Sequence, residues 1–216
     1  MSSPVVELNE AVAVLGSFPV LAGATVRIDA GDIVLLRGPN GAGKTSLLRL
    51  CAGLLPIVRG TGHVLGFDLA TGRESVREHV GMLGHQNGLY LDLSVGENVR
   101  FWGATVGATA DEIHAAMVRL GVAERLVDVP VRTLSAGQKR RTALACLVAR
   151  RSQLWLLDEP HAGLDADARD ELDATLRQAA ASGATIVVAS HELERAGSLA
   201  TRIVDVIGGR LHEEAP

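Results

Sequence analysis

The feature that most restricts the fold of this chain is a glycine-rich segment at residues 38–45, which reads GPNGAGKT. It matches the pattern G-x-x-x-x-G-K-[S/T], which requires a strand before it and a helix after it. Both are expected, because the apolar residues 33–36 precede the segment and the leucine-rich residues 46–50 follow it. The segment therefore predicts a strand–loop–helix unit whose loop turns backbone N–H groups toward an anion.

The cation inside this loop points to phosphate as the anion. Lys44 and Lys139 are the only lysines among 21 basic residues. An ammonium is a compact charge that fits between phosphate oxygens, where a planar guanidinium does not. We interpret the loop as a site for a nucleoside triphosphate, in preference to a simple glycine turn. Its candidate nucleotide-binding residues are Gly38, Pro39, Asn40, Gly41, Ala42, Gly43, Lys44, Thr45 and Ser46.

Composition favours one folded domain. The 216 residues are 47% hydrophobic and 21% charged, which provides a sizeable core and argues against disorder. The net charge of −4 gives no general attraction to nucleic acid. No apolar run reaches the roughly 20 residues of a bilayer span, and the first residues do not resemble a signal peptide. The chain is expected to be cytosolic, with Cys51 and Cys146 as buried apolar residues.

Two kinds of strand pattern flank a helical region. Residues 5–36 alternate like strands, and 60–69 can add another, which predicts an antiparallel lobe. Residues 88–151 have a helical pattern, with a capping box at 109–112. Residues 212–216 are expected to be a frayed end. Further strands are expected at 80–84, 154–157, 185–189 and 203–207. Because they alternate with helices, they predict a mostly parallel sheet that binds ligands at the carboxyl ends of its strands.

Two carboxylates follow the apolar strand at 154–157. Asp158 at the strand tip is suited to hold Mg²⁺, the ion that bridges phosphate oxygens, together with Thr45 of the loop. Glu159 is one residue further and points differently, so it is placed to orient or deprotonate a water. An Asp-Glu pair at a strand end is usually an ordinary turn. In a chain that also contains the phosphate loop, it predicts a catalytic pair.

A second helix start offers another anion site. The segment 134–138 reads LSAGQ and opens an amphipathic helix, with Ser135 as its N-cap. Alone, this pattern would be only a cap. Its position shortly before the strand at 154–157 makes the combined order of motifs distinctive. The candidate nucleotide-binding residues here are Ser135, Ala136, Gly137 and Gln138.

In this order the motifs resemble those of ABC-type ATPases, the nucleotide-binding subunits of ABC transporters, over nearly the whole chain. The resemblance implies an α/β, P-loop NTPase (RecA-like) fold with a mostly parallel sheet, an N-terminal antiparallel β lobe and an inserted helical subdomain. It assigns 1–86 and 152–216 to the catalytic core with its β lobe, and 87–151 to the helical subdomain.

The resemblance also implies roles for particular residues. Segments 38–45, 134–138 and 154–158 correspond to the Walker A, signature and Walker B motifs, and 163–165 to the D-loop. Glu159 would be the catalytic glutamate and His191 the switch histidine that touches the γ-phosphate. Gln86 would be the Q-loop residue, with a catalytic and a metal-binding role. The implied cofactors are ATP and Mg²⁺.

Two partners are implied as well. The signature of one copy would complete the ATP site of a second copy, and residues 87–101 would contact an integral membrane subunit. The chain would then lie on the inner face of the cell membrane. Two departures from the family pattern stand out. Ala136 replaces the usual glycine of the signature, and Leu15 or Gly16 stands where an aromatic residue usually stacks on adenine, with Phe18 nearby.

Within the family, the closest likeness is to the ATP-binding subunits of the haem exporters of cytochrome c maturation. This likeness rests on segments 84–89 and 94–99 and on the signature that contains Ala136 and is followed by Arg140 and Arg141. The alternatives are the ATPase of a multidrug or lipid exporter and a soluble ABC ATPase of translation or DNA repair, although the latter usually has two cassettes or a coiled-coil insertion. A P-loop kinase or GTPase would share 38–45 but has no need of the other motifs.

Other basic residues are expected to have ordinary roles. The pairs at 140–141 and 150–151 could suggest a nucleic-acid patch, but no aromatic residues are interleaved with them. We therefore expect solvated charges on the signature helix. The remaining histidines lack metal-ligand spacing, and surface or structural roles are expected for them. They are His63, His79, His85, His114, His161 and His212.

Overall fold

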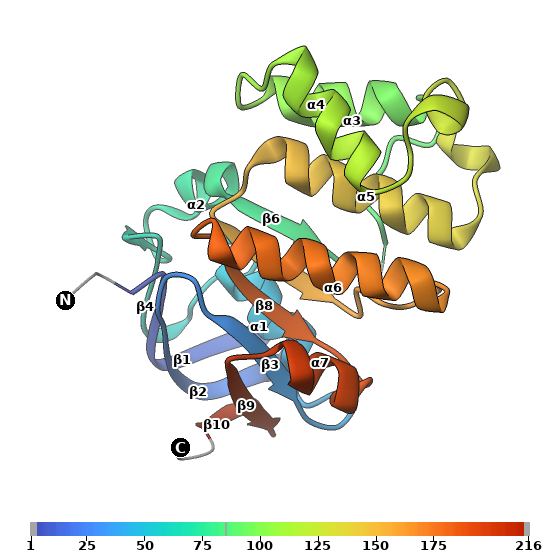
Figure 1. The fold of residues 1–216 in the computed structure, drawn as a ribbon. Helices are drawn as coiled ribbons and strands as arrows, with labels where there is room; N and C mark the ends of the chain where they lie inside the picture. The colour runs from blue at the N-terminus through green and yellow to red at the C-terminus, as the bar shows by residue number, and fades with distance from the viewer. Residues whose placement is uncertain (1–3, 85, 214–216) are drawn as a thin grey trace. The chain divides into compact units, whose positions relative to one another are not determined.

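The computed structural model describes residues 4–84 and 86–213, and the chain divides into two compact units (Figure 1). The first comprises Met1–Met82, Gln153–Glu159 and Ala179–Pro216, and the second comprises Leu83–Ser152 and Pro160–Gln178. The first unit contains the β-sheets. The second is helical, and the two are described separately below.

An antiparallel sheet in the order β2-β1-β4-β5 forms one part of the first unit. Side chains of β1 alternate between the core and solvent, and a bulge at Glu10, whose φ is +48°, resets the alternation so that Ala11 and Ala13 are buried like Val6. The predicted antiparallel lobe is confirmed. Its strands are β1 (Val6–Leu15), β2 (Phe18–Ile28), β4 (Arg59–Val64) and β5 (Phe67–Asp68).

A second sheet in the order β10-β9-β3-β8-β7-β6 forms the other part. Strands β9, β3, β8 and β7 pair in parallel, and every residue of β7 and β8 is buried, as expected of a sheet covered on both faces. The strands are β3 (Ile33–Arg37), β6 (Val80–Leu83), β7 (Leu154–Asp158), β8 (Thr185–Ala189), β9 (Arg202–Ile207) and β10 (Arg210–Glu213). The predicted mostly parallel α/β sheet is confirmed.

Some elements of the first unit were not predicted. Besides α1 (Lys44–Cys51), it contains α2 (Arg73–His79) and α7 (Leu193–Leu199), which are too short to show a clear helical period. The prediction of a frayed end was wrong for His212 and Glu213. Both lie in β10, where hydrogen bonds to β9 order a strand whose own sequence gives little signal.

The second unit is built around α5 (Ala136–Arg150), which packs against α3 (Val95–Ala104) and α4 (Ala110–Arg119). Each of these helices begins with a capping box, at Ser94, Thr109 and Ser135. The backbone N–H groups of Ser94 and Thr109 lower the pKa values of the Glu97 and Glu112 carboxyls that accept from them. The unit also holds two 3₁₀ turns (Glu124–Leu126, Val131–Thr133) and most of α6 (Ala166–Ala181).

The cysteines match their prediction. Cys51 on α1 and Cys146 on α5 are free and buried, and burial raises the pKa of each thiol to about 12. Among residues 4–84 and 86–213, none of the helices combines the length and hydropathy that crossing a membrane would require.

Candidate nucleotide site

The phosphate loop joins the carboxyl end of β3 to α1, as predicted. Its Gly43 is the N-cap of α1 with φ of 113°, a left-handed conformation that favours glycine. Gly38 has φ of 150°, and a Cβ on it would lie 2.2 Å from the carbonyl oxygen of Val206 on β9. The loop therefore takes its shape against other strands, and its glycines make that approach possible.

Lys44 lies over this loop. Its side-chain ammonium donates to the carbonyl oxygens of Gly38 at 2.6 Å and Pro39 at 3.1 Å, and the residue is only 8% exposed. The lysine thus stands at the start of α1 with its charge held beside the loop backbone. A compact cation at a helix N-terminus is a favourable place for phosphate oxygens.

Thr45 and Asp158 meet at the carboxyl edge of the sheet. The Thr45 hydroxyl donates to Asp158 Oδ2 at 2.8 Å, although the two residues are 113 positions apart. A hydroxyl and a carboxylate are hard oxygen donors, which Mg²⁺ prefers. No group of three or more His, Cys, Asp or Glu side chains in the described part of the chain could hold a metal. The donor set fits a magnesium ion that takes its other ligands from phosphate and water.

Glu159 and His191 lie together beside this pair. The Glu159 N–H donates to the Ala189 carbonyl at 2.8 Å, and its φ of 48° is left-handed. Its carboxylate accepts from the Ser190 hydroxyl at 3.4 Å and from the His191 N–H at 3.3 Å. His191 Nε2 is 3.4 Å from Glu159 Oε1, with side chains 54% and 30% exposed. A carboxylate that solvent reaches, oriented by the end of β8, has the geometry of a general base.

The signature segment in the second unit is organised by its own cap. Ser135 Oγ accepts from the Gln138 N–H at 3.2 Å, and Gln138 Oε1 accepts from the Ser135 N–H at 2.9 Å. Ser135 and Ala136 are exposed at the start of a helix of 15 residues. A Cβ on Gly137 would lie 3.1 Å from the carbonyl oxygen of Gly163, so the turn after β7 comes close to this helix start.

Comparison with known proteins agrees with this arrangement. Residues 21–162, more than half of the chain, match the ABC transporter family. The chain belongs to the ABC transporter family. It is similar to an ATP-binding subunit of an ABC transporter of known structure, with a TM-score of 0.89 and 26% identity over 97% of this chain and 90% of that one.

Proteins related in sequence also match most of the length of this chain. The chain is 39% identical to the cytochrome c biogenesis ATP-binding export protein CcmA 2 of Cupriavidus metallidurans, with 89% of this chain and 92% of that protein covered. It is 40% identical to CcmA of Paramagnetospirillum magneticum over 88% and 89%. A dimeric ATP-binding cassette bound to ADP and Pi shares the fold, with a TM-score of 0.84 and 21% identity over 98% of this chain and 99% of that one.

These findings confirm the fold class and make the chain an ABC-type ATPase. The roles of its individual residues remain predictions. Gln86 is exposed and belongs to the second unit. The signature residues Ser135, Ala136, Gly137 and Gln138 belong to the same unit. His85, which belongs to the segment 84–89 that resembles the haem-exporter subunits, lies outside the described residues. Leu15 and Phe18 pair across the β1–β2 turn, and both are exposed in this ATPase.

Arg140 corrects a prediction. It was expected to be a solvated charge on the signature helix, but it is only 4% exposed. Its guanidinium donates to the carbonyl oxygens of Pro160 and Gly84 at 3.2 and 2.8 Å, and to the Asn87 side chain at 3.1 Å. Sequence reasoning missed it because adjacent arginines on a helix face in different directions, and only packing decides which one is buried.

The histidines keep the structural or surface roles that were expected where they are described. His161 is the most buried of them, at 1% exposed, and its Nε2 lies 2.8 Å from Asp173 Oδ1 on α6. This pair attaches the turn that follows the Walker B strand to α6 within the second unit. Nothing in the residues around His161 signals this pairing, because Asp173 lies 12 positions further along the chain.

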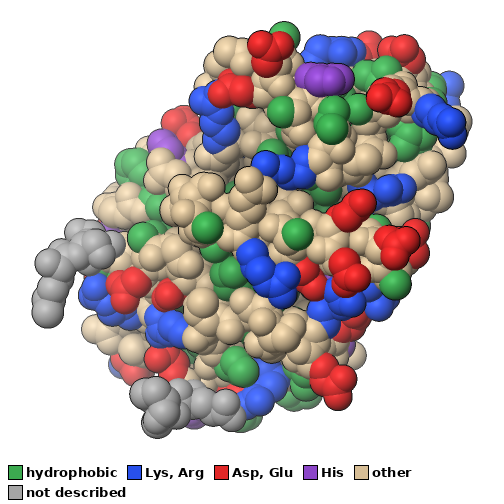
Figure 2. Space-filling view, viewed as in Figure 1, with side chains coloured by type: hydrophobic (Ala, Val, Ile, Leu, Met, Phe, Trp, Pro, Cys, Tyr) green, Lys and Arg blue, Asp and Glu red, His purple; other side chains and the backbone are tan. Residues whose placement is uncertain are grey.

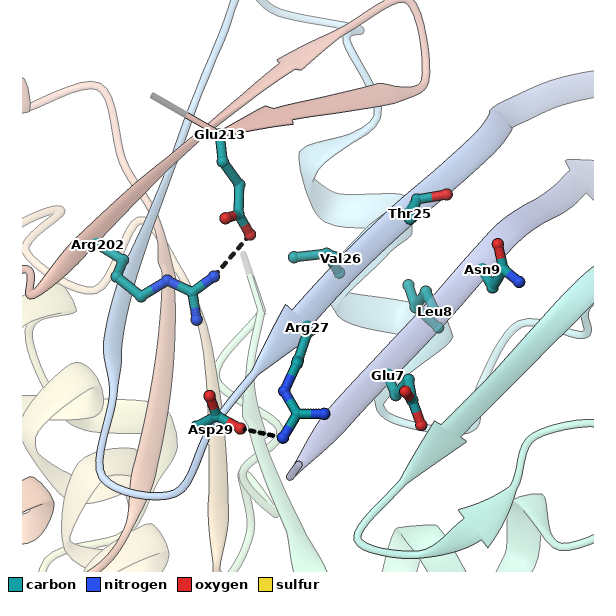
Figure 3. Close-up of a pocket in the computed structure, with 9 residues that line it drawn as sticks. All are labelled: Glu7, Leu8, Asn9, Thr25, Val26, Arg27, Asp29, Arg202 and Glu213. Carbon is teal, nitrogen blue, oxygen red and sulfur yellow. Dashed lines mark hydrogen bonds and ion pairs between the residues drawn. The ribbon is translucent and has the colours of Figure 1, made fainter. Parts of the chain in front are cut away.

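The visible charge distribution and one hollow of the first unit can be compared with the nucleotide site. The face in Figure 2 intersperses Asp and Glu with Lys and Arg and shows no broad basic surface. Figure 3 shows a hollow beside β1 and β2 whose arginines are paired, Arg27 with Asp29 at 3.0 Å and Arg202 with Glu213 at 2.6 Å. Asp29 precedes β3 and Arg202 begins β9, so this hollow lies at the opposite strand ends from the phosphate loop.

Proposed function

We propose that this ATPase drives an export system of cytochrome c biogenesis, with haem as the cargo, and that it hydrolyses ATP at the site built from residues 38–46, Asp158, Glu159 and His191. One observation carries the catalytic part: Thr45, Asp158, Glu159 and His191 converge at the carboxyl edge of one sheet. The cytochrome c part is supported by the names of the CcmA relatives. The choice of haem is supported by the sequence resemblance alone.

The chemistry follows from these side chains. Residues of the phosphate loop bind the phosphates through backbone N–H groups and the Lys44 ammonium. Thr45 and Asp158 would hold Mg²⁺, which would neutralise phosphate charge. Glu159 orients the attacking water and takes its proton. His191, 3.4 Å from that carboxylate, contacts the γ-phosphate and keeps Glu159 in place.

The test is a substitution of Glu159. Glu159→Gln keeps the size of the side chain but cannot accept the proton, so we expect turnover to fall about 10²–10⁴-fold while ATP binding is kept. Lys44→Ala, by contrast, is expected to weaken ATP binding in addition to lowering turnover. Glu194→Gln, an exposed glutamate on α7, is the matched control. Wild-type turnover in Glu159→Gln would remove the role proposed for Glu159.

The working unit we propose is a two-fold dimer with two ATP molecules at its interface. The exposed start of α5 offers N–H groups to the phosphates bound by a second copy, and a two-fold axis lets identical chains complete each other's sites. Light scattering of Glu159→Gln with and without Mg-ATP tests this. A mass that stays monomeric at saturating ATP and high protein concentration contradicts the dimer.

The second partner we propose is an integral membrane subunit that docks on residues 87–101, which would place the ATPase on the inner face of the membrane. Val95 lies within this segment and is apolar, but it is fully buried and therefore not available for docking. The exposed apolar side chains there are Tyr90, Leu91 and Phe101, with the Tyr90 and Phe101 rings edge to face at 5.2 Å. Leu91→Glu is expected to release the ATPase from membranes without slowing its basal turnover.

The cargo needs a cellular test. Deleting the gene in a cell with no second copy should abolish covalent haem staining of membrane c-type cytochromes, and the wild-type gene should restore it. Normal c-type cytochromes would remove the haem assignment. The ATPase of a multidrug or lipid exporter would then be the remaining interpretation, because fold and motifs alone do not determine cargo.

A further inference from the structure

The turn between β9 and β10 lies directly against the phosphate loop. Gly208 and Gly209 form this two-residue turn, with φ of 55° and 77°. Left-handed backbone at both central residues is the type I′ geometry that matches the twist of a hairpin. The strand after it, β10, includes His212 and Glu213, which were expected to fray, and no role was expected for this turn.

Gly209 forms hydrogen bonds in two directions. Its N–H donates to the carbonyl oxygen of Ala42 in the phosphate loop at 2.9 Å, and its own carbonyl accepts from the N–H of Ala22 on β2 at 2.8 Å. Ala42 O and Gly43 N–H belong to one planar trans peptide, in which they point in opposite directions. A turn that holds Ala42 O therefore aims the Gly43 N–H away from itself.

The backbone around Gly209 leaves little room for a side chain. A Cβ on Gly209 would lie 3.0 Å from Ala22 N and 3.1 Å from Val20 O. A Cβ on Gly43 would lie 2.7 Å from the same Val20 oxygen and 3.5 Å from Gly209 Cα. The loop, β2 and the turn thus pack backbone to backbone. By contrast, a Cβ on Gly208 would meet nothing within 4 Å.

We propose that Gly209 is a positioning residue for nucleotide binding, which sets the direction of the Gly43 N–H before nucleotide arrives. The inference rests on the proposed function, in which residues 38–46 bind the ATP phosphates. A donor that is already aimed lowers the cost of ordering the loop on binding. Gly209 acts through the loop backbone, 166 residues along the chain from Gly43, and does not itself touch phosphate.

Two neighbouring substitutions test this. Gly209→Ala and Gly208→Ala make the same chemical change at adjacent left-handed positions, so both strain the turn. Only Gly209→Ala places a Cβ against the β2 backbone at Ala22 and Val20, so only this variant should disturb the Gly209 hydrogen bonds to Ala22 and Ala42. Binding of Mg-AMP-PNP is measured by calorimetry at a temperature where circular dichroism shows both variants folded. We expect about tenfold weaker binding for Gly209→Ala and a change within about twofold for Gly208→Ala.

The outcomes separate this inference from the proposed function. Wild-type protein that does not bind Mg-AMP-PNP would overturn both. Wild-type binding together with unchanged affinity in Gly209→Ala, even with a lower melting temperature, would overturn the inference alone, because a merely structural glycine changes stability and not affinity. Equal losses of affinity in the two variants would also overturn it.

A measurement on the unaltered protein covers the case in which Gly209→Ala does not fold. If the Gly209 N–H is coupled to the loop, saturating Mg-AMP-PNP should slow its hydrogen exchange more than that of a reference amide in the β lobe. The reference is Leu65, whose N–H donates to the Val5 carbonyl at 2.7 Å. An equal change at Gly209 and Leu65 would reflect only global stabilisation and would overturn the inference.

Discussion

The phosphate loop and the start of the signature helix both present backbone N–H groups at a helix N-terminus, yet they are held by different means. The cap of α5 is complete within four residues, through two hydrogen bonds between Ser135 and Gln138. The phosphate loop has no side-chain cap at Gly43 and is shaped by backbone from β2, β9 and the β9–β10 turn.

Because the two helix starts are held by different contacts, they should differ in how strongly a substitution destabilises them. A locally capped helix start depends only on residues of its own first turn, so its geometry does not require any distant segment to be in place. A loop held by distant strands keeps its geometry only while those strands are in place. We therefore expect substitutions around the phosphate loop to cost more than substitutions within the signature cap.

The largest effect should come from Gly38→Ala. The new Cβ would lie 2.2 Å from the Val206 carbonyl oxygen, a backbone atom that cannot turn aside. We expect a loss of roughly 3 kcal/mol in the free energy of unfolding, measured by urea denaturation. Gly41→Ala is the matched comparison, because a Cβ there meets nothing within 4 Å and only the left-handed strain remains, about 1 kcal/mol. Equal losses would contradict packing as the cause.

Arg140→Ala tests whether the signature helix also depends on distant contacts after its first turn. It removes the guanidinium that bonds Pro160, Gly84 and Asn87, so we expect about 2 kcal/mol of destabilisation in thermal or urea unfolding. Arg141→Ala, next to it and partly exposed, should change stability by only about 0.5 kcal/mol. If both variants unfolded alike, the buried contacts would contribute nothing.

Ser135→Ala should have a smaller effect. It removes one of the two bonds of the capping box, at a cost of about 1 kcal/mol. Ser135→Asp keeps an acceptor at the N-cap and is expected to preserve most of the stability. A loss in Ser135→Ala as large as that of Gly38→Ala would remove the contrast between the two sites.

The smallest effect concerns a polar attachment of the phosphate loop. Arg37, the last residue of β3, donates to both carboxylate oxygens of Asp205 on β9, at 2.6 and 2.7 Å. These bonds lower the pKa of Asp205 below its unfolded value. The stability they supply is therefore present above the unfolded pKa, near 4, and is lost as the pH falls through the folded pKa.

Asp205→Asn removes this titration. At pH 7 we expect the variant to be less stable than wild type by less than about 1 kcal/mol, since the pair is partly exposed. The difference should shrink as the pH is lowered below about 4. Urea unfolding at several pH values measures it, and a difference that grows toward acid would reverse the sign assigned to Asp205.

Local patterns in the sequence were sufficient for one class of features. The strand–loop–helix order around 38–45, the caps at Ser135 and Thr109, the apolar strand before Asp158 and the burial of both cysteines follow from neighbouring residues. Each depends on interactions within a few residues or on hydrophobic patterning, which a single sequence displays directly. The family followed from the order of those motifs.

Other features depended on which segments meet. The sequence does not show that Arg140 is buried beside Arg141, that His161 pairs with Asp173, or that β10 pairs with β9 instead of fraying. Short helices such as α2 and α7 give no period that a pattern can detect. In each case the partner lies outside the segment, so the segment's own residues do not determine the outcome.

Consecutive residues encode the phosphate loop, the Walker B carboxylate pair and the signature helix, so all three could be predicted before the fold was known. The Thr45–Asp158 hydrogen bond, the approach of His191 to Glu159 and the Gly209–Ala42 hydrogen bond depend instead on how the strands assemble. Parallel strands bring their carboxyl ends to one edge whatever their distance along the chain, so residues far apart in sequence become neighbours only when the sheet forms.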